Sequence, residues 1–283
     1  MNTPSPPTAE PPPTVHELLA FYLEAGVDCA LLDEPPNRLL DPEIVPPPAA
    51  VPSPSANRPA PAPVTMARAP AAAAPAPDVA IASAREAART APTLEALRTL
   101  LETFDGCALK QTATRLVFAD GNPQARIMFV GEAPGRDEDL EGIPFIGRSG
   151  KLLDRMIGAV GLDRTTAYIT NVIPWRPPGN RDPSPQETQI CLPFIKRQIE
   201  LVDPDVLVCL GKPSSQAVLE LKDGIMRTRG RWHNYDTGTR TIRAMATFHP
   251  AYLLRQPIHK RLAWQDLRAI SKALNAAASA PAT

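Results

Sequence analysis

Residues 126–150, RIMFVGEAPGRDEDLEGIPFIGRSG, contain a short apolar run that ends in a glycine-rich turn, and this transition decides the fold class. The run Ile127–Val130 is apolar throughout, as is typical of a strand buried on both faces of a parallel sheet. The turn that follows carries glycines, acidic residues and an aromatic residue, Phe145. Because open α/β sheets bind ligands at the carboxyl ends of their strands, we expect a functional site beside this turn.

Strands and helices alternate along the sequence from this segment towards the C-terminus. Besides Ile127–Val130, short apolar runs predict strands at 167–172, 206–210 and 241–247. Apolar residues at helical spacing predict helices at 151–160, 185–201, 213–221 and 262–277, and an earlier one that opens at Pro92–Thr93. This order predicts an α/β fold for residues 83–277: a three-layer α/β/α domain around a central, mostly parallel, four-stranded sheet. Residues 278–283 follow as a short tail.

The N-terminal region differs in composition from the rest of the chain. Of the 35 prolines, 20 precede Val79, and they are mixed with alanine without an apolar period. Such a sequence buries too little apolar surface to offset the conformational entropy lost on folding. We therefore expect disorder at residues 1–14 and a semi-rigid, extended Pro/Ala-rich linker at 33–82.

Residues 15–32, VHELLAFYLEAGVDCALL, interrupt this region with apolar residues at helical spacing, namely Leu18, Leu19, Tyr22 and Leu23. They predict a short amphipathic helix on a tether. Two roles are open for this helix. It could dock into a groove of a protein partner, or it could rest loosely on its own domain.

Charge and cysteine content limit the classes of protein. The formal net charge is zero, but residues 1–90 carry 5 basic and 10 acidic side chains, whereas residues 91–283 carry 25 and 20. A mildly basic folded region is compatible with a polyanionic partner. No run approaches the roughly 20 apolar residues of a membrane span, the N-terminus lacks a signal-peptide pattern, and the four cysteines are scattered. We expect a cytoplasmic protein.

Four polar or glycine-rich turns follow the four predicted strands. They are the Gly131 turn, Asn171 with the turn at Pro177–Arg181, the pair Gly211–Lys212, and the pair His249–Pro250. Because the strands of a parallel sheet point the same way, we expect these turns to gather at one edge of the sheet and to form a site.

Asn171 and His249 have side chains suited to recognition and catalysis. The amide of Asn171 can accept and donate hydrogen bonds at adjacent positions, as is needed to read one edge of a base, although a lone Asn often caps a turn. His249 ends a predicted core strand and can donate to an oxygen that gains negative charge, although a lone His is more often structural. Convergence with the other turns favours a functional role for both.

Three further features leave alternatives open. Phe145 can stack on a flat ligand or belong to the core. The acidic residues after Gly131 can bind a metal or form a solvated loop, and most of them are expected to be solvated, with the exception of Glu132, which adjoins the strand end. Residues 251–257, AYLLRQP, can wedge into stacked bases or form the first turn of a helix that packs on the core.

These segments occur together, and in this order, in one protein family. The chain from about Phe104 to Leu274 resembles the family 4 uracil-DNA glycosylases. The resemblance rests on six segments: GEAPG at 131–135, its continuation DEDLEGIPFIGRSG, ITNV at 169–172, RPPGNR at 176–181, VCLG at 208–211 and FHPAYLLR at 248–255. It implies a monofunctional glycosylase that flips uracil out of single- or double-stranded DNA, excises it and leaves an abasic site for base excision repair.

The resemblance also implies roles for individual residues in the pocket. Phe145 would stack on the flipped uracil, Asn171 would read its Watson–Crick edge, and His249 would hydrogen-bond to uracil O2 as the base departs. Glu132, with the backbone amides on either side of it, would line the bottom of the pocket. The expected catalytic residues are His249, Glu132 and Asn171, and the expected substrate-binding residues are Gly131, Ala133, Phe145 and Asn171.

Contacts to DNA are implied for two more groups of residues. Those expected at the phosphates are Arg148, Lys151, Asn180 and Arg181. Those expected to fill or flank the gap left in the duplex are Leu253, Leu254 and Arg255.

Water activation and base selectivity are less clearly assigned by the resemblance. In the best-known uracil glycosylases an aspartate in the first turn orients the attacking water, whereas this chain has Ala133 at that place. We expect Glu132 or Glu138 to help position the water instead. Phe145 and its loop are the expected barrier against the 5-methyl group of thymine.

A cofactor implied by the resemblance does not match this sequence. Family 4 enzymes usually hold a 4Fe–4S cluster on four cysteines. Cys107 and Cys191 match the second and fourth positions, but Phe104 and Trp175 stand at the first and third. Two thiolates cannot hold a cluster that needs four. We therefore predict no cluster, metal or other cofactor, with apolar packing by Phe104 and Trp175 and two reduced thiols.

Other functions remain as alternatives. Some relatives trap uracil-DNA covalently through the motif histidine, but they carry a basic insertion before it, and here residues 244–248 read AMATF. Excision of hypoxanthine or xanthine stays open, and an accessory role without catalysis is disfavoured by the intact Asn171 and His249. We expect a monomer with uracil-containing DNA as partner, no membrane partner, and a bacterial-type, nucleoid-associated location.

Overall fold

The computed structural model describes residues 77–278. The predicted disorder at 1–14, the predicted helix at 15–32 and most of the predicted linker lie outside the described residues, as does the tail from residue 279. Within residues 77–278, no helix is both long and apolar enough to span a membrane.

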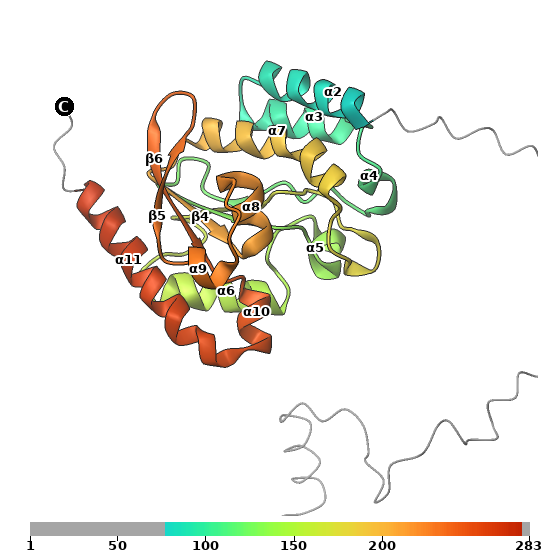
Figure 1. Cartoon of the computed structure of the whole chain (residues 1–283). Helices are drawn as coiled ribbons and strands as arrows, with labels where there is room; N and C mark the ends of the chain where they lie inside the picture. The colour runs from blue at the N-terminus through green and yellow to red at the C-terminus, as the bar shows by residue number, and fades with distance from the viewer. Residues whose placement is uncertain (1–76, 279–283) are drawn as a thin grey trace, which may run out of the picture. The chain divides into compact units, whose positions relative to one another are not determined.

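A six-stranded sheet has the strand order β1-β3-β2-β4-β6-β5. The sheet lies between the helices, with β4, β5 and β6 labelled in Figure 1. Its inner strands are parallel to one another and coincide with the four predicted strands. They are β2 (Ile127–Gly131), β3 (Tyr168–Asn171), β4 (Val206–Leu210) and β6 (Thr241–Thr247). Every residue of β2, β3 and β4 is buried, because helices cover both faces of the sheet.

Two antiparallel edge strands, β1 (Asp120–Gly121) and β5 (Trp232–Asp236), correct the predicted number of strands from four to six. β1 has only 2 residues, and β5, with the sequence WHNYD, has no buried residue. Edge strands of this kind lack the continuous apolar run that marks a buried strand, so the sequence pattern did not reveal them.

Helices form a layer on each face of the sheet (Figure 1). One layer contains α2 (Pro77–Thr90), α3 (Leu94–Thr103), α7 (Pro185–Val202) and α8 (Lys212–Leu219), and the other contains α6 (Arg148–Gly158) and α11 (Lys260–Ala278). Residues of β2 alternate between these layers: Met128 and Val130 pack in the first cluster, and Ile127 and Phe129 in the second. The three-layer α/β/α prediction is confirmed.

Shorter helices connect these elements. They are α4 (Leu109–Thr112), α5 (Arg136–Glu141), α9 (Ile225–Thr228), α10 (Pro250–Arg255) and the 3-10 helices η1 (Pro178–Asn180) and η2 (Pro257–His259). Residues 251–257 begin as helix α10, with Pro250 at its first position and Leu253 packed on the core, whereas the predicted wedge into stacked bases stays a prediction.

Helix α2 shows that the folded domain begins before the predicted boundary at residue 83. Its buried face is a row of alanines packed against α7: Ala80, Ala84 and Ala88. Arg197 of α7 also donates from Nε and Nη2 to the carbonyl oxygen of Ala91, at 3.0 and 2.8 Å. Alanine beside proline is typical of a linker, and only the close approach of α7 turns these small side chains into a stable contact.

Candidate active site

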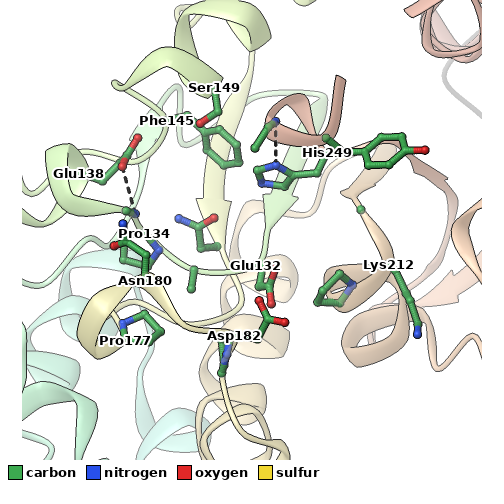
Figure 2. A pocket seen from close by; sticks show the side chains of 18 of the residues that line it. Glu132, Pro134, Glu138, Phe145, Ser149, Pro177, Asn180, Asp182, Lys212 and His249 are labelled. Carbon is green, nitrogen blue, oxygen red and sulfur yellow. Dashed lines mark hydrogen bonds between the residues drawn. The ribbon is translucent and has the colours of Figure 1, made fainter. Parts of the chain in front are cut away.

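The carboxyl ends of the inner strands border one pocket of about 570 Å³ (Figure 2). Each of the four turns predicted to converge contributes to its lining, through residues that include Glu132, Asn171, Lys212 and His249. A pocket at this edge is the usual ligand site of an open α/β sheet. The structure therefore brings the predicted turns together and shows how each side chain is held.

Asn171 lies at the end of β3 with an unsatisfied amide oxygen. The residue is 4% exposed, and its Oδ1 has no hydrogen-bond partner within residues 77–278. Gly131 on the neighbouring strand makes room for the amide, because a Cβ atom there would lie 2.3 Å from Oδ1. A buried acceptor without a partner costs about 1–3 kcal/mol. A turn cap would use this oxygen, so the arrangement points instead to a ligand that donates to it.

His249 is the N-cap of α10, and its ring has a defined hydrogen-bonding state. The backbone N–H of Ala251 donates to Nδ1 at 3.1 Å, so Nδ1 is unprotonated and the ring proton of the neutral histidine is on Nε2. Burial, together with the positive charge of Arg255, lowers the pKa of His249 to about 4. At neutral pH the pocket therefore contains an uncharged imidazole that can donate from Nε2.

Phe145 forms a wall of the pocket and is also part of the core. It is 4% exposed, lines the pocket, and packs in the same cluster as Leu153 and Ile157 of α6. Its ring centroid is 5.5 Å from that of His249, with the planes tilted by 32°. The two predicted interpretations of Phe145 are therefore compatible, because one ring both closes the core and faces the pocket.

Glu132 and Asp182 place two carboxyl groups in the pocket, and Figure 2 shows these groups pointing toward one another. Burial and the nearby charge of Asp182 raise the pKa of Glu132 to about 7. Asp182 was missed in the sequence. The available signal was its position directly after the RPPGNR turn, which already marked that loop as part of the site. Ala133 also lines the pocket and leaves the first turn without a side-chain oxygen at its place.

Glu138 holds the backbone of the site together, which corrects its predicted role in positioning water. Its Oε2 accepts from the backbone N–H of Gly135 at 3.0 Å. Its Oε1 accepts from the N–H groups of Ile146 and Gly147, at 3.1 and 3.0 Å. Both oxygens are occupied by the protein, and they tie the first turn to the loop that carries Phe145. Among the two candidates for water positioning, only Glu132 has a carboxylate without a hydrogen-bond donor from the described residues.

The residues predicted to contact DNA lie around the mouth of the pocket, with the exceptions of Lys151 and Leu253. Asn180, Arg181 and Arg255 line the pocket itself. A shallower depression beside it is lined by Arg148, Leu254 and Arg136, the last of which was not predicted. Lys151 is exposed on α6 and lines neither hollow.

Leu253 and Arg181 both make contacts within the protein, with different consequences for their predicted roles. Leu253 is 1% exposed and packs with Phe248 and Ala263, so its side chain anchors α10 to the core. Leu254, which is 37% exposed, is the leucine that faces solvent. A helix buries only one of two successive leucines, which the sequence alone could not resolve. Arg181 pairs with Glu187 at 2.6 Å at the start of α7, while its side chain is 47% exposed and lines the pocket, so its contact with DNA stays a prediction.

The residues around Cys107 and Cys191 do not fit a 4Fe–4S cluster. Both thiols are buried and share a hydrogen bond, which lowers the pKa of Cys107. Phe104 packs edge-on against Phe194 with centroids 5.0 Å apart, and Trp175 is 2% exposed. Within residues 77–278, no three His, Cys, Asp or Glu side chains gather as metal ligands. The absence of a cluster stays a prediction, which this shortage of ligands supports.

Comparison with known proteins gives one consistent family. Residues 118–268 match the uracil DNA glycosylase superfamily. A type-4 uracil-DNA glycosylase from Archaeoglobus fulgidus is 44% identical to this chain over 155 residues, which are 53% of this chain and 78% of that protein. Type-4 enzymes from Thermotoga maritima and Sulfurisphaera tokodaii are 40% and 38% identical over 164 and 183 residues. These matches cover 57% and 63% of this chain and 84% and 83% of the two relatives.

Proposed function

The chain belongs to the type-4 branch of the uracil-DNA glycosylase superfamily, and from this membership we propose that it excises uracil from DNA and leaves an abasic site. The observation that carries the proposal is the buried Oδ1 of Asn171, which has no hydrogen-bond partner among the described residues and lies in a pocket lined by Phe145 and His249. A base can enter such a pocket only after it has left the duplex stack, at a cost of about a few kcal/mol.

Asn171 is the group that reads the base in this proposal. Uracil presents an N–H at position 3 between the carbonyl oxygens O2 and O4. The Oδ1 of Asn171 would accept from N3–H, and its amide nitrogen would donate to the adjacent O4. The unpaired state of Oδ1 in the free protein supports this role, because binding would supply the missing donor.

His249 stabilises the departing base. When the bond between uracil N1 and the sugar C1′ breaks, its electron pair stays on uracil, and negative charge spreads onto O2. A neutral imidazole with its proton on Nε2 would donate a hydrogen bond to that oxygen. Because the pKa of His249 is about 4, the ring keeps this state throughout the physiological range.

Glu132 positions the water that completes the reaction. The oxygen of water bonds to C1′, one of its protons passes to the carboxylate or to solvent, and the uracil anion leaves the pocket. A pKa of about 7 leaves a substantial fraction of Glu132 ionised at neutral pH, as this role requires. Arg148, Arg255 and Lys151 would contact phosphates, and Arg136 extends this group. Asn180, at the pocket rim, would add a neutral contact.

The remaining parts of the proposal concern the setting of the enzyme. It would act as a monomer, on single- or double-stranded DNA, in the cytoplasm and near the nucleoid. The helix predicted at residues 15–32 would bind a protein partner on the tether that precedes α2. Trapping of uracil-DNA without turnover and excision of other deaminated bases are the competing outcomes of the experiment below.

The test is a time course with an oligonucleotide that contains one uracil. One half of each sample is treated with alkali to reveal abasic sites, and the other half is run on a denaturing protein gel. We expect alkali-labile product in excess of enzyme, with no shifted protein band. A shifted band without turnover would establish trapping, and the absence of both signals would overturn uracil as the substrate. Matched oligonucleotides with hypoxanthine or xanthine test the wider specificity.

A further inference from the structure

Phe145 has a backbone conformation that must be held in place by its surroundings. Its φ angle is 56°, in the left-handed region that a bulky side chain rarely adopts. Such a conformation is strained and persists only where neighbouring contacts determine it. Because the Phe145 ring forms a wall of the pocket, the contacts that fix this backbone also fix the shape of the pocket.

Arg164, in the turn between α6 and β3, holds the carbonyl groups on this side of the loop. Its Nη2 donates to the carbonyl oxygen of Phe145, and its Nη1 donates to that of Pro144 at 3.1 Å. The guanidinium is itself held by two carboxylates, with Nη1 2.6 Å from Asp120 of β1 and Nε 2.9 Å from Asp154 of α6. A planar group with five N–H donors can make these four contacts at once, which an ammonium group cannot.

The other side of the loop is fixed by different residues. Glu138 accepts from the N–H groups of Ile146 and Gly147, as described above. Gly150 lies directly against the Phe145 carbonyl, since a Cβ atom there would be 1.6 Å from the carbonyl oxygen. The carbonyl of Phe145 is therefore confined between Gly150 and Arg164. Arg164 does not line the pocket, so any effect on bound substrate passes through Phe145.

We propose that Arg164 is the positioning residue for the Phe145 wall, and that it thereby sets the rate of excision and the discrimination against 5-substituted uracils. The inference rests on the proposed glycosylase function. Without the guanidinium, the loop loses its hold on two carbonyl groups, and the strained Phe145 relaxes. A displacement of the ring by about 1 Å is enough to cost up to about 100-fold in rate.

The test is Arg164→Met, compared with wild type for kcat, KM and relative excision of uracil, 5-fluorouracil and thymine placed opposite guanine. We expect kcat for uracil to fall by roughly 10- to 100-fold, and the preference for uracil over the 5-substituted bases to fall with it. KM should change little, because phosphate contacts dominate DNA binding. Arg164→Lys should have a kcat between those of Arg164→Met and wild type, since one ammonium group cannot make all the contacts of the planar guanidinium.

Arg126→Met is the matched control. Arg126 also joins a carboxylate and a carbonyl, with Nε 2.6 Å from Asp205 and Nη2 3.1 Å from the Leu274 oxygen, but it lies away from the pocket. Its loss should lower the melting temperature and leave kcat and base preference unchanged. If Arg164→Met behaves like this control, Arg164 is merely structural and the proposal is wrong.

A double-mutant cycle with Phe145→Ala separates positioning from a general loss of folding. If Arg164 acts through the ring, Arg164→Met should change kcat by less than about twofold in the Phe145→Ala background. Additive losses would overturn the proposal. If Arg164→Met does not fold, Asp120→Asn weakens the same guanidinium and takes its place in the cycle. Wild-type turnover in the same assay shows whether a failure belongs to this inference or to the glycosylase function itself.

Discussion

The pocket differs from the region around Cys107 and Cys191 in whether its buried polar groups have partners within the described residues. In the pocket, the Oδ1 of Asn171 has no partner within residues 77–278, and burial together with the charge of Asp182 raises the pKa of Glu132. Around the two cysteines, the thiols share a hydrogen bond, and aromatic side chains fill the space. A site that a ligand completes keeps a free-energy cost in the free protein. A site without enough cofactor ligands has been packed as ordinary core.

The largest effect expected from this comparison is that of Asn171→Ala on activity. We expect kcat/KM for uracil to fall by about 10²–10³-fold, because the base loses its reading group at the reaction centre. The melting temperature should stay the same or rise, since no hydrogen bond of Oδ1 within the protein is lost. Single-turnover excision and thermal unfolding measure the two effects.

Asn122→Ala is the control with the opposite pattern. Asn122 accepts from the backbone N–H of Gln124 at 2.9 Å and lies outside the pocket. Its substitution should lower the melting temperature without affecting excision. The assignment of Asn171 as a ligand group would be contradicted if Asn171→Ala left the excision rate within a few-fold of wild type. It would also be contradicted if Asn171→Ala lowered the melting temperature as Asn122→Ala does.

The second effect is one of stability, in the other region. Phe104→Ala should lower the free energy of unfolding by about 3 kcal/mol, because it leaves a cavity against Phe194. Excision at temperatures well below the transition should be unchanged. Denaturant unfolding and the excision rate are the measurements, with Trp264→Ala as control, since Trp264 is an aromatic residue that is 42% exposed. A loss of activity without a loss of stability would mean that this region communicates with the pocket.

Sequence patterns predicted the elements that are buried and regular. β2 and β4 are apolar throughout, β3 and β6 have apolar residues at buried positions, and their parallel order placed Asn171 and His249 at one sheet edge. The patterns failed where a neighbouring element determines whether a segment is buried or forms a strand. Alanines of α2 become core only against α7, and β5 is a strand only because β6 pairs with it.

Within the site, residue types were predicted better than their contacts. Glu132 follows β2 directly and Glu138 lies six residues later in α5, yet backbone N–H groups donate to the carboxylate of Glu138 and, within residues 77–278, not to that of Glu132. Leu253 and Leu254 are adjacent, and the helical phase of α10 buries only the first. Asp182 and Arg164 act through residues distant in sequence, so their roles required the folded chain.

A smaller effect concerns the pH dependence of excision. If ionised Glu132 positions water, the excision rate should rise with pH, and this rising limb of the pH profile should have its midpoint near pH 7. The negative charge of Asp182 contributes to the raised pKa of Glu132, so Asp182→Asn should lower that pKa and move the limb to lower pH. The shift should be modest because burial is the larger cause and persists. The profile of kcat/KM against pH measures it.

Glu132→Gln and Asp223→Asn complete this test. Glu132→Gln should abolish the limb, because it removes the titrating group. Asp223→Asn removes an acidic residue that is exposed and outside the pocket, so it should leave the limb where it is. If the rising limb persists in Glu132→Gln, another group titrates there, and Glu132 does not position the water.

The smallest effect is expected at the cysteines themselves. If Cys107 and Cys191 are ordinary core residues, replacing either by alanine should change the excision rate by less than about twofold, since neither contacts the pocket. Purified wild type should contain far less than one cluster of iron per chain and lack the visible absorbance of such a cluster. Phe104→Cys combined with Trp175→Cys supplies four thiols and is the positive control for iron uptake. Stoichiometric iron in wild type, lost with activity in Cys107→Ala, would mean that both regions of the domain depend on a ligand, and the contrast between them would disappear.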